Sequence, residues 1–140
     1  MTKEPRDTRI LIVDDEPDFR DSLAFLFRKR GYQVFLAAGG HEAFACIQGA
    51  AFDLIISDIR MPEGDGIELL NRLKGENGQM SIVLLVTCFS YITTAFAREN
   101  GAKALFSKPF DPRVFDQMIQ GLLSSAGYLD DRSARAREVR

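Results

Sequence analysis

Carboxylate, hydroxyl and amine side chains follow four short apolar runs of the chain. Asp14 and Asp15 come directly after RILIV, and Asp58 comes directly after DLIIS. Thr87 follows IVLLV, and Lys108 follows ALFS. A carboxylate can act as a nucleophile or hold a cation, and an amine can neutralise an anion. Each residue alone also has an ordinary structural explanation, such as capping a helix or a turn, so these side chains form a site only if the fold gathers them.

Five short apolar runs read as buried strands. Three of them are nearly continuous in apolar residues, which is typical of strands covered on both faces, as in a parallel sheet. Helical patterns separate the runs, and this alternation predicts a parallel sheet with right-handed crossovers and helices on both faces. Ligands bind such sheets beyond the carboxyl ends of the strands, so the polar residues that follow the runs should share one rim. The runs span residues 9–13, 32–37, 53–57, 82–86 and 104–107.

The helical patterns have recognisable starts and ends. Pro17 and Pro112 lie where first turns would begin, and Gly31 and Gly101 lie where the first and fourth helices would end. The chain thus reads as five βα units. Several aromatic residues fall on the apolar stripes of these helices, so we expect them in the core rather than stacked on nucleic-acid bases. They are Phe19, Phe27, Phe44 and Phe96.

Composition places the chain among ordinary globular proteins. Its 140 residues suffice for one domain with one core, and 46% are hydrophobic and 27% charged. With 18 Lys and Arg against 20 Asp and Glu the net charge is −2, so we expect no direct binding to nucleic acid. The polar N-terminus, and the lack of an apolar run near the roughly 18 residues of a membrane span, predict a cytoplasmic protein. Cys46 and Cys88 lack a metal-binding spacing, which agrees with a reducing compartment.

Four motifs, in this order and at these separations, give the chain a family resemblance. ILIVDDE, DLIISDIRMP, VLLVT and ALFSKPF resemble the receiver domain of bacterial two-component response regulators, from Arg9 to Leu123. The resemblance implies an α/β fold, a flavodoxin-like doubly wound (βα)5 three-layer sandwich with a parallel sheet of order 2-1-3-4-5. We expect an N-terminal extension at 1–8, the receiver domain at 9–125, and a C-terminal tail or the start of a linker helix at 126–140.

The resemblance also implies a function. Asp58 would accept a phosphoryl group from a phosphohistidine of a sensor histidine kinase or a histidine phosphotransfer protein. Mg²⁺ is the expected ion, with Mn²⁺ as an alternative, because the charge on the transferred group must be neutralised. Thr87 and Lys108 would contact phosphoryl oxygens. The implied metal ligands are Asp15 and Asp58 directly, Asp14 directly or through water, and the backbone carbonyl of Arg60.

Three positions depart from the family pattern. Leu105 stands where the family usually has a Tyr or Phe whose ring swings inward on phosphorylation, so the switch formed by Thr87 and Leu105 is expected to be altered. Arg60 and Phe89 flank the path of the water that hydrolyses the acyl phosphate in the family, and neither is suited to position that water. We therefore expect a phosphorylated state that lasts many minutes or longer.

The expected role is that of a phosphorylated signalling switch rather than an enzyme that turns over a metabolite. It would signal through a downstream protein partner or a detached output domain, without membrane association, as a monomer or a weak phosphorylation-dependent dimer. The alternative is a pseudo-receiver that docks without phosphorylation, although all five expected site residues are present. A flavin-binding protein would have a phosphate-binding loop after the first run. A haloacid-dehalogenase-type phosphatase would have an Asp at the position of Arg60.

Overall fold

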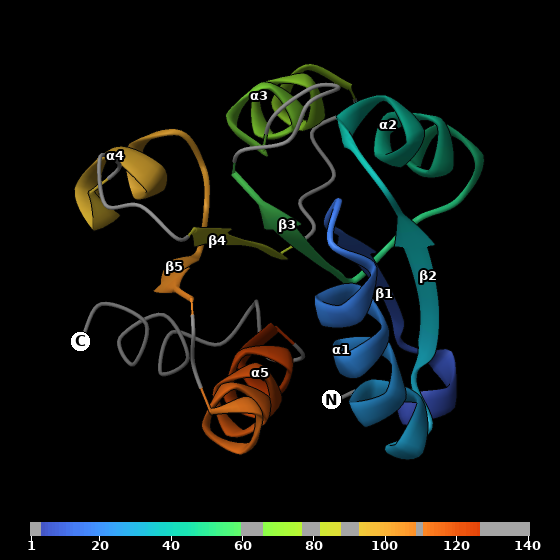
Figure 1. Ribbon diagram of the computed structural model, residues 1–140. Coiled ribbons are helices and arrows are strands. Elements are labelled where there is room, and N and C mark those ends of the chain that lie inside the picture. The colour runs from blue at the N-terminus through green and yellow to red at the C-terminus, as the bar shows by residue number, and fades with distance from the viewer. Residues whose placement is uncertain (1–3, 60–65, 77–81, 88–92, 109–110, 127–140) are drawn as a thin grey trace.

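The computed structural model contains a five-stranded sheet with helices on both of its faces (Figure 1). It describes residues 4–59, 66–76, 82–87, 93–108 and 111–126, and for 73–76, 82–87 and 125–126 it describes the backbone alone. All four pairs of neighbouring strands are parallel, and the strand order is β2-β1-β3-β4-β5. The predicted flavodoxin-like sandwich and its strand order are confirmed.

The elements follow the predicted alternation, and strand bounds differ from the predicted ones by one residue at most. The strands are β1 (Arg9–Val13), β2 (Gln33–Ala37), β3 (Leu54–Asp58), β4 (Ile82–Thr87) and β5 (Ala104–Ser107). The helices are α1 (Pro17–Lys29), α2 (Gly40–Gly49), α3 (Gly66–Glu76), α4 (Thr94–Glu99) and α5 (Pro112–Ala126), with a short 3-10 helix at Pro5–Asp7. Gly31 and Gly101 follow α1 and α4 with φ of 96° and 104°, as expected of glycines that end helices. Among the described residues, no helix has the length and hydropathy to cross a membrane.

Two apolar clusters cover the two faces of the sheet. Helices α1 and α5 pack on one face, where Phe27 is fully buried, and α2, α3 and α4 cover the other face (Figure 1). Successive side chains of a strand point to opposite faces, so each strand serves both clusters. Ile10 and Ile12 of β1 belong to the cluster beneath α1 and α5, and Leu11 and Val13 belong to the cluster beneath α2, α3 and α4. The sheet is therefore buried on both faces, as its continuous apolar runs predicted.

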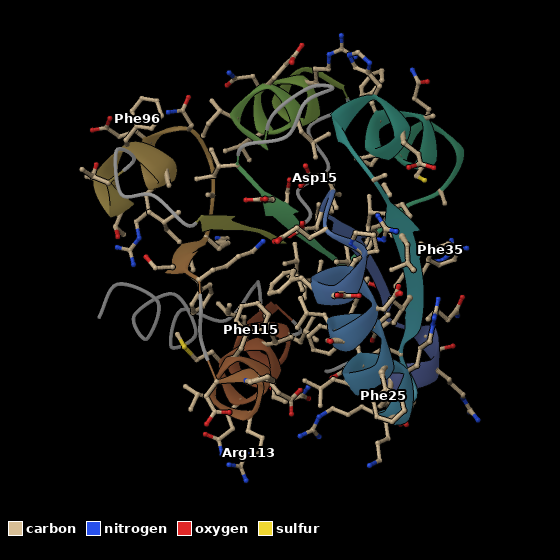
Figure 2. The ribbon with its side chains drawn as sticks, in the orientation of Figure 1. Asp15, Phe25, Phe35, Phe96, Arg113 and Phe115 are labelled. Atoms are coloured by element: carbon tan, nitrogen blue, oxygen red, sulfur yellow. The ribbon has the colours of Figure 1, made fainter. Side chains whose placement is uncertain are left out.

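One residue expected in the core lies at the surface. Phe96 of α4 is 42% exposed and points away from the sheet (Figure 2), so the prediction that it is buried is wrong. Phe27 is buried, and Phe19 and Phe44 are partly buried against the two clusters. Helix α4 has only six residues, and its small residue Ala97 takes the buried position. Such a short apolar pattern does not determine which side of the helix faces the sheet.

Candidate functional site

Three carboxylates gather at the carboxyl ends of β1 and β3. The register pairs Val13 with Ser57, so the residues that follow, Asp14 and Asp58, reach the same rim of the sheet. One oxygen from each of Asp14, Asp15 and Asp58 lies within 4.8 Å of the others. Figure 2 shows Asp15 at this end of β1. Parallel pairing thus brings together acidic residues that are far apart in the sequence.

Asp14 is buried and fixed by hydrogen bonds on its backbone and side chain. Its Oδ1 accepts a hydrogen bond from the backbone N–H of Glu16 at 2.9 Å, which turns the chain into α1. Its own N–H donates to the Ala37 carbonyl at 3.1 Å. Its carbonyl accepts from Nη1 of Arg20 on α1 at 2.9 Å. Asp14 is therefore a rigid anchor of the rim.

Asp58 is the last residue of β3, and 11% of its side chain is exposed. Its Oδ1 accepts a hydrogen bond from the backbone N–H of Ile59 at 2.8 Å. The pKa of the Asp58 carboxyl is raised to about 6, chiefly by burial and also by the charges of Asp14 and Asp15, whereas Lys108 opposes the rise. The charged form of Asp58 is thus disfavoured in the metal-free protein. A bound cation would remove that disadvantage.

The first residue of α3 fits closely against Asp58. The N–H of Gly66 donates to the carbonyl of Ile59 at 2.8 Å. A β-carbon at Gly66 would lie 2.5 Å from the carbonyl oxygen of Asp58, so glycine alone permits this approach. The start of α3 therefore helps to fix the backbone of Asp58.

Lys108 follows β5 and directs its ammonium group into the carboxylate cluster. Its Nζ lies 2.8 Å from Asp14 Oδ2 and 2.9 Å from Glu16 Oε1. The distance to Asp58 Oδ2 is longer, at 3.6 Å, and the ring centre of Phe19 lies 4.1 Å away. Burial acts to lower the pKa of Lys108, but hydrogen bonds to Asp14 and Glu16 outweigh it and raise the pKa above its ordinary value. Lys108 is therefore a firmly charged cation within this site.

The donor set fits a small divalent cation. Mg²⁺ prefers hard oxygen ligands and takes a few carboxylates together with water, and three carboxylates within 4.8 Å of one another supply such oxygens. These three carboxylates carry more negative charge than the single ammonium group of Lys108 can balance. The rim can therefore hold a divalent cation and, beside it, an anion that Lys108 contacts.

Three of the predicted site positions are not placed in full. Thr87 ends β4 opposite Ser107 of β5, so its backbone lies on the same rim, but its side chain is not described. Arg60 and Phe89 lie outside the described residues. The carbonyl ligand, the threonine contact and the two positions that would modulate hydrolysis therefore stay predictions.

Leu105 of β5 is partly buried and packs against the cluster beneath α2, α3 and α4. The next residue, Phe106, faces the other side of the sheet and contacts Phe115 of α5, with ring centres 4.9 Å apart. Neighbouring residues of a strand point to opposite faces. Phe106 therefore does not supply the aromatic ring that is missing at position 105.

Sequence reasoning missed two contacts of Lys108, those with Glu16 and Phe19. Glu16 belongs to the acidic run after β1, so the sequence indicated that it lies near the rim. The sequence did not indicate that its partner is Lys108. Its contact with Lys108 joins residues 92 apart in the chain, so no local pattern could reveal it. Phe19 was assigned to the core stripe of α1, where it does pack, and its ring also faces the ammonium.

Comparison with known proteins settles the family. The family model of the response regulator receiver domain matches residues 10–120. The chain belongs to this family. This receiver is 37% identical over 126 residues to the transcriptional regulatory protein ZraR of Salmonella typhimurium, covering 89% of this chain and 28% of that protein. It is 36% identical over 103 residues to the sporulation initiation phosphotransferase F of Bacillus subtilis, covering 74% of this chain and 83% of that protein.

Solved structures agree with the assignment. A response regulator receiver domain protein from Methanospirillum hungatei superposes with a TM-score of 0.79 at 32% identity, covering 85% of this receiver and 95% of that chain. The response regulator TrrA of Thermotoga maritima, solved in complex with Mg²⁺ and BeF, gives a TM-score of 0.73 at 28% identity, covering 82% of this receiver and 98% of that chain. The fold of this receiver is thus that of a known structural family.

This receiver corresponds to only part of the length of some relatives and to most of the length of others. The receiver spans 28% of the length of ZraR, which is named as a transcriptional regulatory protein. The comparisons therefore do not support our expectation that the protein does not bind nucleic acid directly.

Proposed function

We propose that this receiver accepts a phosphoryl group on Asp58 from a phosphohistidine of a sensor histidine kinase or a histidine phosphotransfer protein. The observation that carries the proposal is the gathering of Asp14, Asp15 and Asp58 at one rim with the ammonium of Lys108. Membership of the response regulator receiver family supports it. The acyl phosphate on Asp58 would then be the signal.

The transfer is an in-line displacement at phosphorus. A carboxylate oxygen of Asp58 attacks, an O–P bond forms, and the N–P bond of the phosphohistidine breaks. The imidazole nitrogen leaves with the bonding electron pair. The protein contributes little covalent chemistry beyond the carboxylate itself, so its main tasks are positioning and neutralisation of charge.

Neutralisation of charge falls to the residues of the rim. Mg²⁺ or Mn²⁺ bound there would offset the negative charge of the phosphoryl group. Lys108 would donate a hydrogen bond to a phosphoryl oxygen as a charged donor. The ligands would be Asp15 and Asp58 directly, Asp14 directly or through water, and the backbone carbonyl of Arg60.

Phosphorylation of Asp58 would change the conformation of the receiver through β4 and β5. The hydroxyl of Thr87 would bond to a second phosphoryl oxygen, and the usual aromatic partner of this movement is replaced by Leu105. We infer a weaker coupling between the rim and the outer face of β5 for that reason. Arg60 and Phe89 would slow hydrolysis, because neither is suited to orient the attacking water.

The receiver would act in the cytoplasm as a switch without metabolite turnover. Residues 1–8 would form an extension, 9–125 the receiver domain, and 126–140 a tail or the start of a linker helix. The phosphorylated form would signal through a protein partner or an output domain, as a monomer or a weak dimer. Direct nucleic-acid binding by residues 9–125 is not part of the proposal, since the net charge of the chain is −2.

Intact-mass measurement tests the proposal. Incubation with phosphoramidate and Mg²⁺ should add about 80 Da to the wild type, and chelation of the metal should prevent the addition. Asp58→Asn should gain no mass, because an amide is not a nucleophile for this step. A phosphoryl group on Asp58→Asn would show that another residue is the acceptor. A wild type that gains none would favour the docking module that works without phosphorylation.

A further inference from the structure

The ammonium group of Lys108 is held by one segment of the chain, the turn from β1 into α1. Asp14 Oδ2 and Glu16 Oε1 accept its hydrogen bonds at 2.8 and 2.9 Å, and the ring of Phe19 faces it at 4.1 Å. Asp58 Oδ2, at 3.6 Å, lies beyond hydrogen-bond distance. We call Asp14, Glu16 and Phe19 the lysine cradle.

The lysine cradle engages two of the three donors of the ammonium group and one of its faces. A lysine has three N–H donors, of which two bond to the carboxylates of Asp14 and Glu16. The ring of Phe19 lies against the group through a cation–π contact. Asp14 and Glu16 hold the ammonium group nearer to themselves than to Asp58, so they compete with a phosphoryl oxygen on Asp58 for it.

Glu16 is the partner that gives way at least cost. The side chain of Asp14 is 1% exposed, so in the metal-free protein a carboxylate that lost Lys108 there would stay buried without its cationic partner. The side chain of Glu16 is 62% exposed, so water replaces the lysine once they separate. The two carboxylates thus differ sharply in how readily they release the same ammonium.

We propose that Glu16 is a positioning residue that holds Lys108 back from Asp58 and competes with the phosphoryl group for its ammonium. The inference rests on the proposed function of Asp58 as the phosphoacceptor. Glu16 would set how readily the phosphorylated form is reached, without touching the metal ion or the reacting atoms. Removing its contact should favour any ligand on Asp58 that draws in Lys108.

Three variants separate the contact from the charge. Glu16→Gln removes the charge and keeps the shape, whereas Glu16→Asp keeps the charge and withdraws the carboxylate by one methylene. Asp18→Asn is the matched control, because Asp18 is an exposed carboxylate in the first turn of α1, two residues away from Glu16. The probes are beryllofluoride with Mg²⁺, which mimics the acyl phosphate, and Mg²⁺ alone, which reports on the metal site without the mimic.

We expect Glu16→Asp and Glu16→Gln to bind beryllofluoride roughly two- to fivefold more tightly than the wild type, in line with the strength of exposed ion pairs. Affinity for Mg²⁺ alone should stay within about twofold for Glu16→Asp, and Asp18→Asn should match the wild type with both probes. NMR of the Lys108 side chain, recorded without metal or beryllofluoride, should show an ordered ammonium group that becomes more mobile in Glu16→Asp.

The outcomes distinguish this inference from the proposed function. Beryllofluoride binding that is equal in wild type and Glu16→Asp, with Lys108 equally ordered in both, would overturn the role of Glu16 and leave Asp58 as acceptor. An increase in Glu16→Gln alone would also overturn it, since charge rather than contact would then explain the change. A wild type that binds no beryllofluoride would remove the proposed function, and the competition with it.

Discussion

The carboxyl group of Asp58 lies where its charged form is disfavoured. Burial raises its pKa from 3.8 to about 6, so without metal the folded state holds this proton more tightly than the unfolded state does. Between these two values the unfolded chain binds fewer protons, and the free energy of unfolding falls as the pH rises. Well below pH 3.8 Asp58 is protonated in both states, and well above pH 6 it is charged in both. In those two ranges its contribution to the free energy of unfolding does not change with pH.

This linkage predicts the stability of Asp58→Asn in EDTA. At pH 7 the variant should exceed the wild type by roughly 2 kcal/mol in free energy of unfolding, and near pH 3 the two should be close. Urea denaturation over this pH range measures the difference, and added Mg²⁺ should stabilise the wild type more than the variant. Asp18→Asn removes an exposed carboxylate and is the control, which should not exceed the wild type in stability. Equal stability of Asp58→Asn and wild type at pH 7 would contradict the argument.

At the scale of elements, the start of α3 determines where the end of β3 lies. The close approach of Gly66 to the Asp58 carbonyl leaves no room for a β-carbon, which would lie 2.5 Å from that oxygen. Gly66→Ala should therefore displace Asp58 or α3, at a cost of about 1 to 3 kcal/mol in stability. Phosphorylation by phosphoramidate should also slow, because the nucleophile moves away from Lys108.

Another glycine provides the control for this prediction. Gly121 lies within α5, and a β-carbon there would meet no atom within 4 Å. Gly121→Ala should raise stability by about 0.5 to 1 kcal/mol, as expected of alanine in a helix, and should leave the rate of phosphorylation unchanged. Urea denaturation and intact-mass time courses measure both effects. A Gly66→Ala protein that matches the wild type in both measurements would show that the rim tolerates the added methyl group.

The sequence could predict the elements and the rim because both depend on local patterns. Apolar runs mark buried strands, and in a parallel sheet the residue after each strand must lie on one edge, which placed Asp14, Asp58 and Lys108 together. The pattern of α4 was too short to show which side is buried, so Phe96 was misplaced. The contact of Glu16 with Lys108 could not be predicted, because it depends on how two distant loops meet.

At the scale of the whole molecule, a polar network joins the end of α1 to α5. Arg30 Nε donates to both oxygens of Asp116 at 2.9 and 2.7 Å, and the side chain of Asp116 is only 6% exposed. Gln120 donates to Asp116 at 3.3 Å and accepts from the hydroxyl of Tyr32 at 2.6 Å. Arg30 and Asp116 lie 86 residues apart, so no pattern in the sequence revealed the pair.

The burial of Asp116 leads to a prediction about the stability of variants in this network. Arg30→Met would leave the buried carboxylate of Asp116 with Gln120 as its remaining described partner, and should cost about 2 to 4 kcal/mol in free energy of unfolding. Arg30→Met with Asp116→Leu should recover much of that loss, because apolar side chains replace both charges. Arg113→Met is the control, since Arg113 is exposed and its 3.8 Å approach to Asp111 should contribute almost nothing.

Urea denaturation of the four proteins, with the wild type as reference, measures these differences. A double variant that is less stable than Arg30→Met alone would show that the carboxylate is well satisfied without the arginine, and that the pair is not the source of the loss. Because the network lies at the far end of α1 from Asp14, the double variant should still gain a phosphoryl group on Asp58. The connection between α1 and α5 would then be a matter of stability, separate from the chemistry at the rim.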